Sequence, residues 1–263
     1  MAEGRGTPRG KPLRLDERLV RDGLAESRSR AEALIRTGRV LVGDVPVEKP
    51  GTKVRDESPV RVRGEDRRYA SRGGEKLAGA LADLGVDPQG LVCLDVGAST
   101  GGFTDCLLQA GARRVVALDV GHGQLHPRLR ADPRVAVLER CHARTVPAAR
   151  VRDAAGAEIG LVVMDVSFIS ATLLLPRAAE IAPGAELLVL VKPQFEVGRE
   201  QVGKGGVVRE DALRAEAVAR VREAARALRY EAAGEAESRL AGPKGNREVF
   251  LLLHPKADRT GTD

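Results

Sequence analysis

From residue 91 onward, short apolar segments alternate with longer segments whose apolar residues recur at helical spacing. Glycine, proline or charged residues bound the short segments, which are therefore predicted to be strands. Strands that alternate with helices form a parallel sheet covered on both faces, because crossovers between parallel strands require helices. The expected fold is α/β, a doubly wound and mostly parallel sheet whose last two strands form an antiparallel edge. Its seven strands are expected at 91–97, 114–120, 135–139, 159–166, 186–192, 229–238 and 246–254.

The first 70 residues follow a different pattern and hold most of the net charge. They contain 17 Lys and Arg against 12 Asp and Glu, a balance of +5, whereas the other 193 residues contain 26 against 25, a balance of +1. A basic segment on a nearly neutral body is typical of a phosphate-backbone binder, although a solvated basic surface would look the same. Aromatic residues make up 2% of the chain, so RNA contacts are expected to rely on charge rather than on a large stacking platform.

Composition excludes several classes of protein. Cys93, Cys106 and Cys141 form no CxxC pair and the four histidines are scattered, so neither a metal site nor a disulfide framework is expected. No apolar run reaches the length of about 18 residues that a membrane span requires, and the first residues lack the apolar core of a signal peptide. The protein is therefore expected to be cytoplasmic, with no membrane partner.

Residues 13–63 are predicted to form two short helices followed by a small sheet. Ser27 is the expected N-cap of the second helix and Gly38 its end. A turn at Gly43-Asp44 separates two short strands, and a third is expected at 59–63. Segments without a helix or strand pattern lie before and after this region.

Those boundaries divide the chain into five parts. Residues 1–12, rich in Gly, Pro and Arg, are predicted to be a disordered basic tail. Residues 64–70 form a charged linker, and a helix over 71–84 opens a larger domain that extends over 71–255. Residues 256–263 are a second tail.

The pattern over residues 13–63 resembles the S4 RNA-binding domain. The matching segments are Arg14-Leu15-Asp16, Ser27-Arg28, Ala31, Leu34-Ile35 and Gly38-Arg39-Val40 with Val42. The resemblance implies a platform that presents Arg14, Arg28, Arg30 and Arg36 to RNA phosphates. Glu26 stands where such domains often have a basic residue, so RNA contact is expected to be weaker at that edge. The alternative is a small basic helical cap packed on the larger domain.

The strongest local motif, Leu94 to Phe103, follows an apolar strand and opens a helix. Its glycines let the backbone approach a ligand, and the helix start presents free N–H groups. The segment G-A-S-T-G-G departs from the G-x-G-x-x-G fingerprint of nicotinamide dinucleotide sites. One acidic residue before the glycines suits a cofactor with an ammonium and a sulfonium, and another after the next strand suits ribose hydroxyls. This layout is typical of class I S-adenosylmethionine methyltransferases, with expected cofactor-binding residues Asp95, Gly97, Ser99, Gly101, Gly102, Phe103 and Asp119.

Four further motifs place charged residues at strand ends or before this loop: Ser71–Leu77, Met164–Phe168, Val191–Phe195 and Asn246–Phe250. With the runs YASRGGEKL, LDVGASTGGFTD, MDVSFIS and KPQFEVGR, they resemble the TlyA family, which joins an S4 domain to an FtsJ-type 2′-O-ribose methyltransferase. The resemblance covers essentially residues 13–254. It implies a catalytic Lys-Asp-Lys-Glu tetrad at Lys76, Asp165, Lys192 and Glu248. An interdomain Arg-x-Trp-Val element of the family corresponds to Arg67–Ala70, with Tyr for Trp and Ala for Val.

The resemblance implies methylation of ribosomal RNA, on a cytidine of the small or large subunit or both. The implied cofactor is S-adenosylmethionine, and the implied partner is ribosomal RNA or a ribosomal subunit. A ribose hydroxyl must lose its proton as it attacks the methyl group, whereas a lysine at its ordinary pKa of ~10.4 is protonated at pH 7. Burial and neighbouring positive charge lower a lysine pKa, so Lys192 is the expected base or oxyanion-stabilising group.

In this scheme Asp165 orients Lys192, and Lys76 and Glu248 hold the ribose. No metal is required, because the sulfonium itself activates the methyl group. An NAD(P)-dependent dehydrogenase would share the fold but lacks its fingerprint. Some family members are also called haemolysins, but a membrane-active protein would need a transmembrane or strongly amphipathic segment. A non-catalytic ribosome-binding factor would need neither the tetrad nor the glycine loop.

Overall fold

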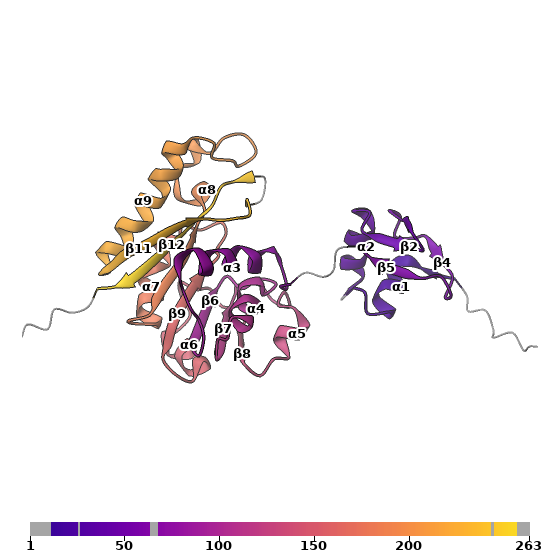
Figure 1. The fold of residues 1–263 in the computed structure, drawn as a ribbon, viewed down its shortest axis with the longest axis horizontal. Coiled ribbons are helices and arrows are strands. Elements are labelled where there is room, and N and C mark those ends of the chain that lie inside the picture. Colours follow the sequence, from indigo (N-terminus) through magenta and orange to yellow (C-terminus); the bar gives the residue numbers. More distant parts are fainter. Residues whose placement is uncertain (1–11, 26, 64–67, 243–244, 257–263) are drawn as a thin grey trace, which may run out of the picture. The chain divides into compact units, whose positions relative to one another are not determined.

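The computed structural model describes residues 12–25, 27–63, 68–242 and 245–256 (Figure 1). The chain divides into two compact units, Met1–Arg67 and Arg68–Asp263, and each is described by itself. The predicted tails, apart from Pro12 and Lys256, lie outside the described residues, as do Glu26 and the linker residues 64–67. The remaining linker residues, 68–70, belong to the second unit.

The small unit consists of two helices, α1 (Leu15–Arg21) and α2 (Arg28–Arg36), and two short sheets. The Ser27 hydroxyl accepts a hydrogen bond from the Arg30 N–H (3.2 Å), and Gly38 has a left-handed φ of +67°, which confirms both predicted ends of α2. The core consists of Leu15, Leu19, Ala25, Ala31, Leu34, Ile35, Val40 and Val54.

The strands of the small unit include one pair that the sequence did not predict. The predicted strands form the antiparallel sheet β3-β2-β5, with bounds Val45–Pro46, Val40–Val42 and Val60–Val62. In addition, β1 (Leu13–Arg14) pairs antiparallel with β4 (Lys53–Val54). Strands of two residues show no side-chain periodicity, so sequence pattern does not reveal them.

The large unit is built on a seven-stranded sheet with the order β11-β12-β10-β9-β6-β7-β8. The strands β10, β9, β6, β7 and β8 are parallel, and β12 lies antiparallel between β10 and β11. This arrangement confirms the predicted mostly parallel sheet with an antiparallel pair at its edge. The bounds are β6 Val92–Val96, β7 Arg114–Leu118, β8 Val135–Leu138, β9 Ile159–Met164, β10 Glu186–Val191, β11 Tyr230–Glu237 and β12 Val249–Pro255.

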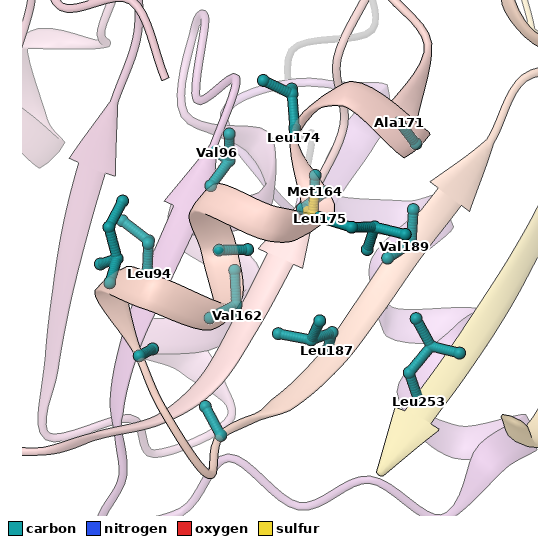
Figure 2. Close-up of a cluster of buried hydrophobic side chains, with 14 of the residues drawn as sticks. Leu94, Val96, Val162, Met164, Ala171, Leu174, Leu175, Leu187, Val189 and Leu253 are labelled. Carbon is teal, nitrogen blue, oxygen red and sulfur yellow. The ribbon is translucent and has the colours of Figure 1, made fainter. Parts of the chain in front are cut away.

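Helices cover both faces of this sheet (Figure 1). On one face, helices α6 (Ala148–Ala155), α7 (Leu175–Ile181) and α9 (Asp211–Ala227) contribute to one hydrophobic cluster with the sheet. Figure 2 shows part of this cluster, in which Leu175 of α7 lies among side chains of β6, β9 and β10. On the other face, α3 (Arg72–Leu84), α4 (Gly102–Gln109) and α5 (Pro127–Arg130) contribute to a second cluster. Successive residues of the central strands alternate between the two clusters, as a doubly wound sheet requires.

Apolar residues at helical spacing in 170–182 predict one helix there, but the structure divides this segment. A 3₁₀ turn, Ala171–Leu173, precedes α7, which begins at Leu175 directly before Pro176. Proline has no N–H and fits the first helical turn, so it sets the start of α7. Helices α5 and α6 were not predicted. Among the described residues, no helix combines the length and the apolar character that a membrane crossing requires.

Candidate functional site

The predicted cofactor loop borders a cavity of about 350 Å³ at the carboxyl end of the parallel strands. The cavity is also lined by Lys76 and by Asp165, which directly follows β9. A larger cavity of about 790 Å³ lies along α3 and α4, but it contains none of the predicted catalytic residues. The smaller cavity is therefore the candidate site, since ligands of open α/β sheets bind at this edge.

The glycine loop packs directly against the end of β9. Gly97 has a φ of +89°, and a Cβ atom there would lie 2.5 Å from the backbone oxygen of Asp165. A larger residue would therefore push the loop away from β9. Ser99, in the same loop, also has a left-handed φ of 48°. Left-handed conformations of residues other than glycine are uncommon and are often found at functional sites.

Asp119 fixes this loop to the end of β7. One carboxylate oxygen accepts a hydrogen bond from the Ser99 N–H (2.8 Å), and the other accepts one from the Gly121 N–H (2.7 Å). Each carboxylate oxygen has a second lone pair, so Asp119 can still accept hydrogen bonds from a ligand. The residue is half-buried, directly after β7, as the sequence predicted.

Asp95 lies beneath the loop rather than at the cavity surface. It is 0% exposed, and one carboxylate oxygen accepts a hydrogen bond from the Thr104 hydroxyl (2.6 Å). The other oxygen, Oδ1, has no hydrogen-bond partner among the described residues. Burial, with a smaller contribution from the negative charge of Asp165, raises the pKa of Asp95 to about 7. Its predicted contact with a cofactor stays a prediction.

The four residues of the predicted tetrad form two ion pairs. Lys192, directly after β10, has its Nζ atom 2.5 Å from Oδ1 of Asp165 and 3.0 Å from the Ser167 hydroxyl. Lys76, in the first turns of α3, has its Nζ atom 2.5 Å from Oε2 of Glu248. Both lysines and Glu248 are buried, and one member of each pair, Lys76 and Asp165, borders the cavity. The fold thus brings the four residues together from four separate segments.

Two phenylalanines next to these pairs were missed by the sequence analysis. Phe168 is 93% exposed and has a left-handed φ of 66°, although both features are unfavourable for a bulky apolar residue. Its ring lies against that of Phe195, with the centroids 5.5 Å apart and the planes at 50°. Low aromatic content argued against a stacking platform, but the chain has only four phenylalanines and two lie together here. The signal was present in the motifs MDVSF and KPQF.

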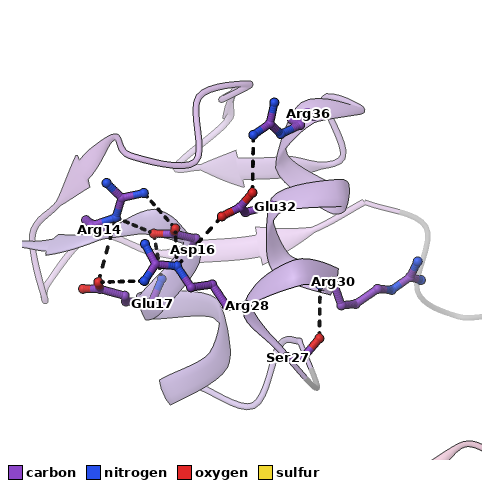
Figure 3. Close-up of polar contacts among 8 residues, drawn as sticks. All are labelled: Arg14, Asp16, Glu17, Ser27, Arg28, Arg30, Glu32 and Arg36. Carbon is purple, nitrogen blue, oxygen red and sulfur yellow. Dashed lines mark hydrogen bonds and ion pairs between the residues drawn. The ribbon is translucent and has the colours of Figure 1, made fainter. Parts of the chain in front are cut away.

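The arginines predicted to bind RNA are grouped around acidic residues of the small unit (Figure 3). Asp16 is 0% exposed and accepts hydrogen bonds from Arg14 (3.0 and 2.9 Å) and from Arg28 (3.0 Å). These bonds lower the pKa of Asp16, with the Arg14 bond as the largest cause. Glu17 lies within ion-pair distance of both arginines.

A third acidic residue at this surface is Glu32. It pairs with Arg36 at 3.3 Å and lies 3.9 Å from Arg28. Arg30 points away from this group in Figure 3, and its side chain forms no ion pair with any described residue. The four arginines therefore lie on one unit, but three of them are partly neutralised.

Comparison with known proteins agrees with this division into two units. The FtsJ-like methyltransferase model matches residues 69–254, and the S4 domain model matches residues 13–60. A relative from Mycobacterium tuberculosis, named 16S/23S rRNA (cytidine-2′-O)-methyltransferase TlyA, is 48% identical over 94% of this chain and 91% of its own. A relative from Brachyspira hyodysenteriae, named Hemolysin A, is 44% identical over 77% of this chain and 83% of its own.

A solved structure agrees with the fold of both units. "Putative hemolysin from Streptococcus thermophilus" superposes with a TM-score of 0.71 at 37% sequence identity, over 95% of this chain and 92% of that chain.

We predict that Asp95 makes the ligand-free protein less stable as the pH rises from about 4 to 7. In this range the folded protein keeps the Asp95 proton and the unfolded chain loses it, so the free energy of unfolding falls by roughly 1.4 kcal/mol per pH unit. Asp95→Asn removes this proton equilibrium, so its stability relative to wild type should rise over that range. Urea unfolding at several pH values measures the difference.

The comparison with wild type is needed because carboxylates with a lowered pKa make the protein more stable as the pH rises. Hydrogen bonds from Gly123 and Arg130 lower the pKa of Glu139 to about 2, although burial opposes them. Asp153→Asn, at an exposed position on α6, is the matched control and should follow the wild-type curve. If the free energy of unfolding changed with pH in the same way for Asp95→Asn and wild type, the raised pKa of Asp95 would be contradicted.

Proposed function

The chain belongs to the TlyA family, in which an S4 domain precedes an FtsJ-like methyltransferase domain, and on that premise we propose that it methylates ribose 2′-hydroxyls of ribosomal RNA. The observation that supports this most strongly is the meeting of two lysine–carboxylate pairs and a glycine loop at one cavity. The relative named for cytidine 2′-O-methylation of 16S and 23S RNA suggests a cytidine as the target. A ribosomal RNA substrate would place the activity in the cytoplasm.

S-adenosylmethionine is the cofactor that the residues around the loop fit best. The hydroxyls of its ribose would bind Asp119, whose two oxygens each have a free lone pair. The unpartnered oxygen of Asp95 lies beneath the same loop. Burial raises the pKa of this carboxyl, and a cationic ligand above it would favour the ionised form. When bound, the cofactor supplies a methyl group that its sulfonium has already activated. The chain's own residues must then position the acceptor hydroxyl and assist the loss of its proton.

Lys192 is the residue best placed to act on the acceptor hydroxyl. Its ammonium group donates a hydrogen bond to the Ser167 hydroxyl and forms an ion pair with Asp165, and both contacts hold it at the end of β10. As a neutral amine Lys192 could accept the proton of the 2′-hydroxyl, and as an ammonium it could stabilise the developing oxyanion. Lys76 borders the cavity from α3, and Glu248 holds it there, so this second pair would bind the ribose.

Phe168, which is exposed, and Phe195, which is half-buried, add a surface for a nucleobase beside these groups. Bases stack on aromatic rings in single-stranded RNA complexes, with gains of about 1–3 kcal/mol per base. A ribose hydroxyl in a folded RNA must leave its helix to reach a narrow cavity, and an exposed ring can hold the displaced base. This pair supports an RNA acceptor over a small-molecule acceptor.

The alternatives have less support. An NAD(P)-dependent dehydrogenase would need a dinucleotide fingerprint, which the loop Gly97–Gly102 does not have. Some relatives are named for haemolysis, but a membrane-active protein has no need for two buried lysine–carboxylate pairs beside a glycine loop. A non-catalytic ribosome-binding factor has no need for them either.

We expect S-adenosylmethionine to bind the full chain and NAD not to bind it. Asp119→Ala should weaken binding of S-adenosylmethionine by about tenfold or more, because hydrogen bonds to a charged group each contribute about 1.5–3 kcal/mol. Isothermal calorimetry measures both affinities, with Asp153→Ala as a control that should bind as wild type does. Binding of NAD in preference to S-adenosylmethionine by the folded protein would contradict the assignment.

Substitution of Lys192 separates proton removal from charge stabilisation. Lys192→Arg keeps a positive charge but offers no neutral amine, because guanidinium does not deprotonate in proteins. If Lys192 is the base, the arginine variant should bind RNA and cofactor but lose nearly all methyl transfer. If Lys192 only stabilises the oxyanion, the arginine variant should retain substantial activity and Lys192→Ala should not. Single-turnover rates at saturating RNA and cofactor measure the chemical step.

A near-wild-type rate for both Lys192 variants would remove this residue from the mechanism. Lys76, which lines the cavity, would then be the remaining candidate.

The acidic residues of the small unit should limit its affinity for RNA. Glu32 pairs with Arg36 and lies 3.9 Å from Arg28, so Glu32→Gln should free Arg36 for phosphates, lower the negative charge beside Arg28 and tighten RNA binding by roughly threefold to tenfold. Arg28→Gln should weaken binding and lower its salt dependence by about one released ion. Filter-binding titrations over a range of salt concentrations test both. Glu57→Gln is the matched control, since Glu57 is exposed and has no ion pair among the described residues.

Glu57→Gln changes the net charge as Glu32→Gln does but frees no arginine. Equal gains in affinity for the two variants would show that net charge, and not the local pairing of Glu32, sets the affinity.

A further inference from the structure

Glu196 is a buried carboxylate that the proposed mechanism does not use. It lies in the short helix α8 (Pro193–Glu196), four residues after Lys192, and is 4% exposed. Burial raises its pKa, and hydrogen bonds from Ser170 and Ala171 oppose that effect. A buried carboxylate is costly unless its oxygens have partners, so its partners indicate what it does.

Both oxygens of Glu196 are bound by the loop that follows β9. Oε2 accepts a hydrogen bond from the Ser170 hydroxyl (2.5 Å), and Oε1 accepts one from the Ala171 N–H (2.8 Å). The Ser170 hydroxyl also lies 2.6 Å from that of Thr172. The other side of α8 is fixed to α9, because Arg220 donates a hydrogen bond to the backbone oxygen of Glu196 (2.6 Å).

The loop 165–171 is therefore attached to the segment 192–196 at both of its ends. At the first end, Asp165 and Ser167 contact Lys192; at the second, Ser170 and Ala171 contact Glu196. Between the two attachments the ring of Phe168 lies against Phe195. A left-handed and almost fully exposed phenylalanine persists only where its surroundings fix the backbone on both sides.

We propose that Glu196 is a positioning residue for methyl transfer, which holds the loop 165–171 so that Lys192 and Phe168 keep their places beside the acceptor. The proposal rests on the methyltransferase function argued above. Glu196 does not contact the acceptor, because it is buried under the loop. Through the loop it positions two groups beside the acceptor. These are the Lys192–Asp165 pair and the pair of Phe168 and Phe195.

Two substitutions at Glu196 separate its geometry from its charge. In Glu196→Gln, the amide oxygen can accept from the Ala171 N–H and the amide nitrogen can donate to the Ser170 oxygen, whose proton then turns to Thr172. Glu196→Ala removes both attachments. Misplacement of a reacting group by about 1 Å can lower a rate on the order of a hundredfold, so we expect a loss of about tenfold to a hundredfold for alanine. We expect the glutamine variant to stay within about threefold of wild type.

The assay is single-turnover methyl transfer to ribosomal RNA at saturating RNA and cofactor, with the affinity for S-adenosylmethionine measured in parallel. Both variants should bind the cofactor as wild type does, because Asp119 holds the glycine loop and the loop's contact with Asp165 is at a residue whose own N–H is bonded to Val96 of β6. Ser170→Ala, which removes one attachment without a large cavity, should give an intermediate rate. Glu223→Ala, at an exposed position of α9, is the control and should not change the rate.

A double-mutant cycle with Phe168→Ala tests whether Glu196 acts through the loop. If it does, Glu196→Ala should cost less in the Phe168→Ala background than in wild type, because the part of its effect that acts through Phe168 is already lost. Independent, multiplicative losses would overturn the proposal, and so would a wild-type rate for Glu196→Ala. A parallel loss of rate and of cofactor affinity would also overturn it, since that result indicates general unfolding.

The wild-type protein in the same assay tests the underlying function separately. No transfer by wild type would overturn the methyltransferase proposal together with this role. Transfer by wild type and by Glu196→Ala at the same rate would overturn the role of Glu196 alone.

Discussion

The register of β9 against β10 is the constraint on which the candidate site depends. Met164 pairs with Val189, so the two neighbouring parallel strands end side by side and their next polar residues, Asp165 and Lys192, meet at 2.5 Å. A shift of register by one residue would turn one of these side chains to the opposite face of the sheet. The glycine loop is packed on the same strand end, because Gly97 lies against the backbone of Asp165. The end of β9 thus positions both the cofactor loop and the acceptor groups. In-line transfer of a methyl group requires such a fixed relation between the two.

The two units place charge in different ways. In the large unit the lysines are buried and each has a carboxylate partner, so their positions are fixed before any ligand binds. In the small unit the arginines remain at the surface, and Asp16 holds Arg14 and Arg28 around one buried point. Pairing with acidic residues lowers the affinity of such a surface for any phosphate backbone. A surface whose arginines are paired in this way favours RNA shapes that contact several arginines at once. This property suits a domain that selects a folded substrate.

Much of this architecture could be predicted from the sequence, because apolar periodicity and turn residues specify it locally. Ser27 and Gly38 mark the ends of α2, and the strand-end positions of Asp119, Asp165 and Lys192 follow from the apolar segments before them. The pairing of Lys76 with Glu248 joins residues 172 positions apart, and only resemblance to a family indicated it. The burial of Asp95, the left-handed Phe168 and the attachment of Glu196 depend on tertiary packing. No local pattern encodes such contacts, and the roles assigned to the site residues stay predictions.

The central claim is that one cavity brings an activated methyl group to a ribose hydroxyl of ribosomal RNA. The most direct measurement is to incubate ribosomal subunits that lack the modification with the full chain and isotope-labelled S-adenosylmethionine, digest the RNA, and identify the labelled nucleoside by mass spectrometry. We expect label on the 2′-oxygen of a ribose, on a cytidine, and no label with Lys192→Ala or with Lys76→Ala. Label on a base, label on protein but not on RNA, or undiminished label with both lysine variants would contradict it.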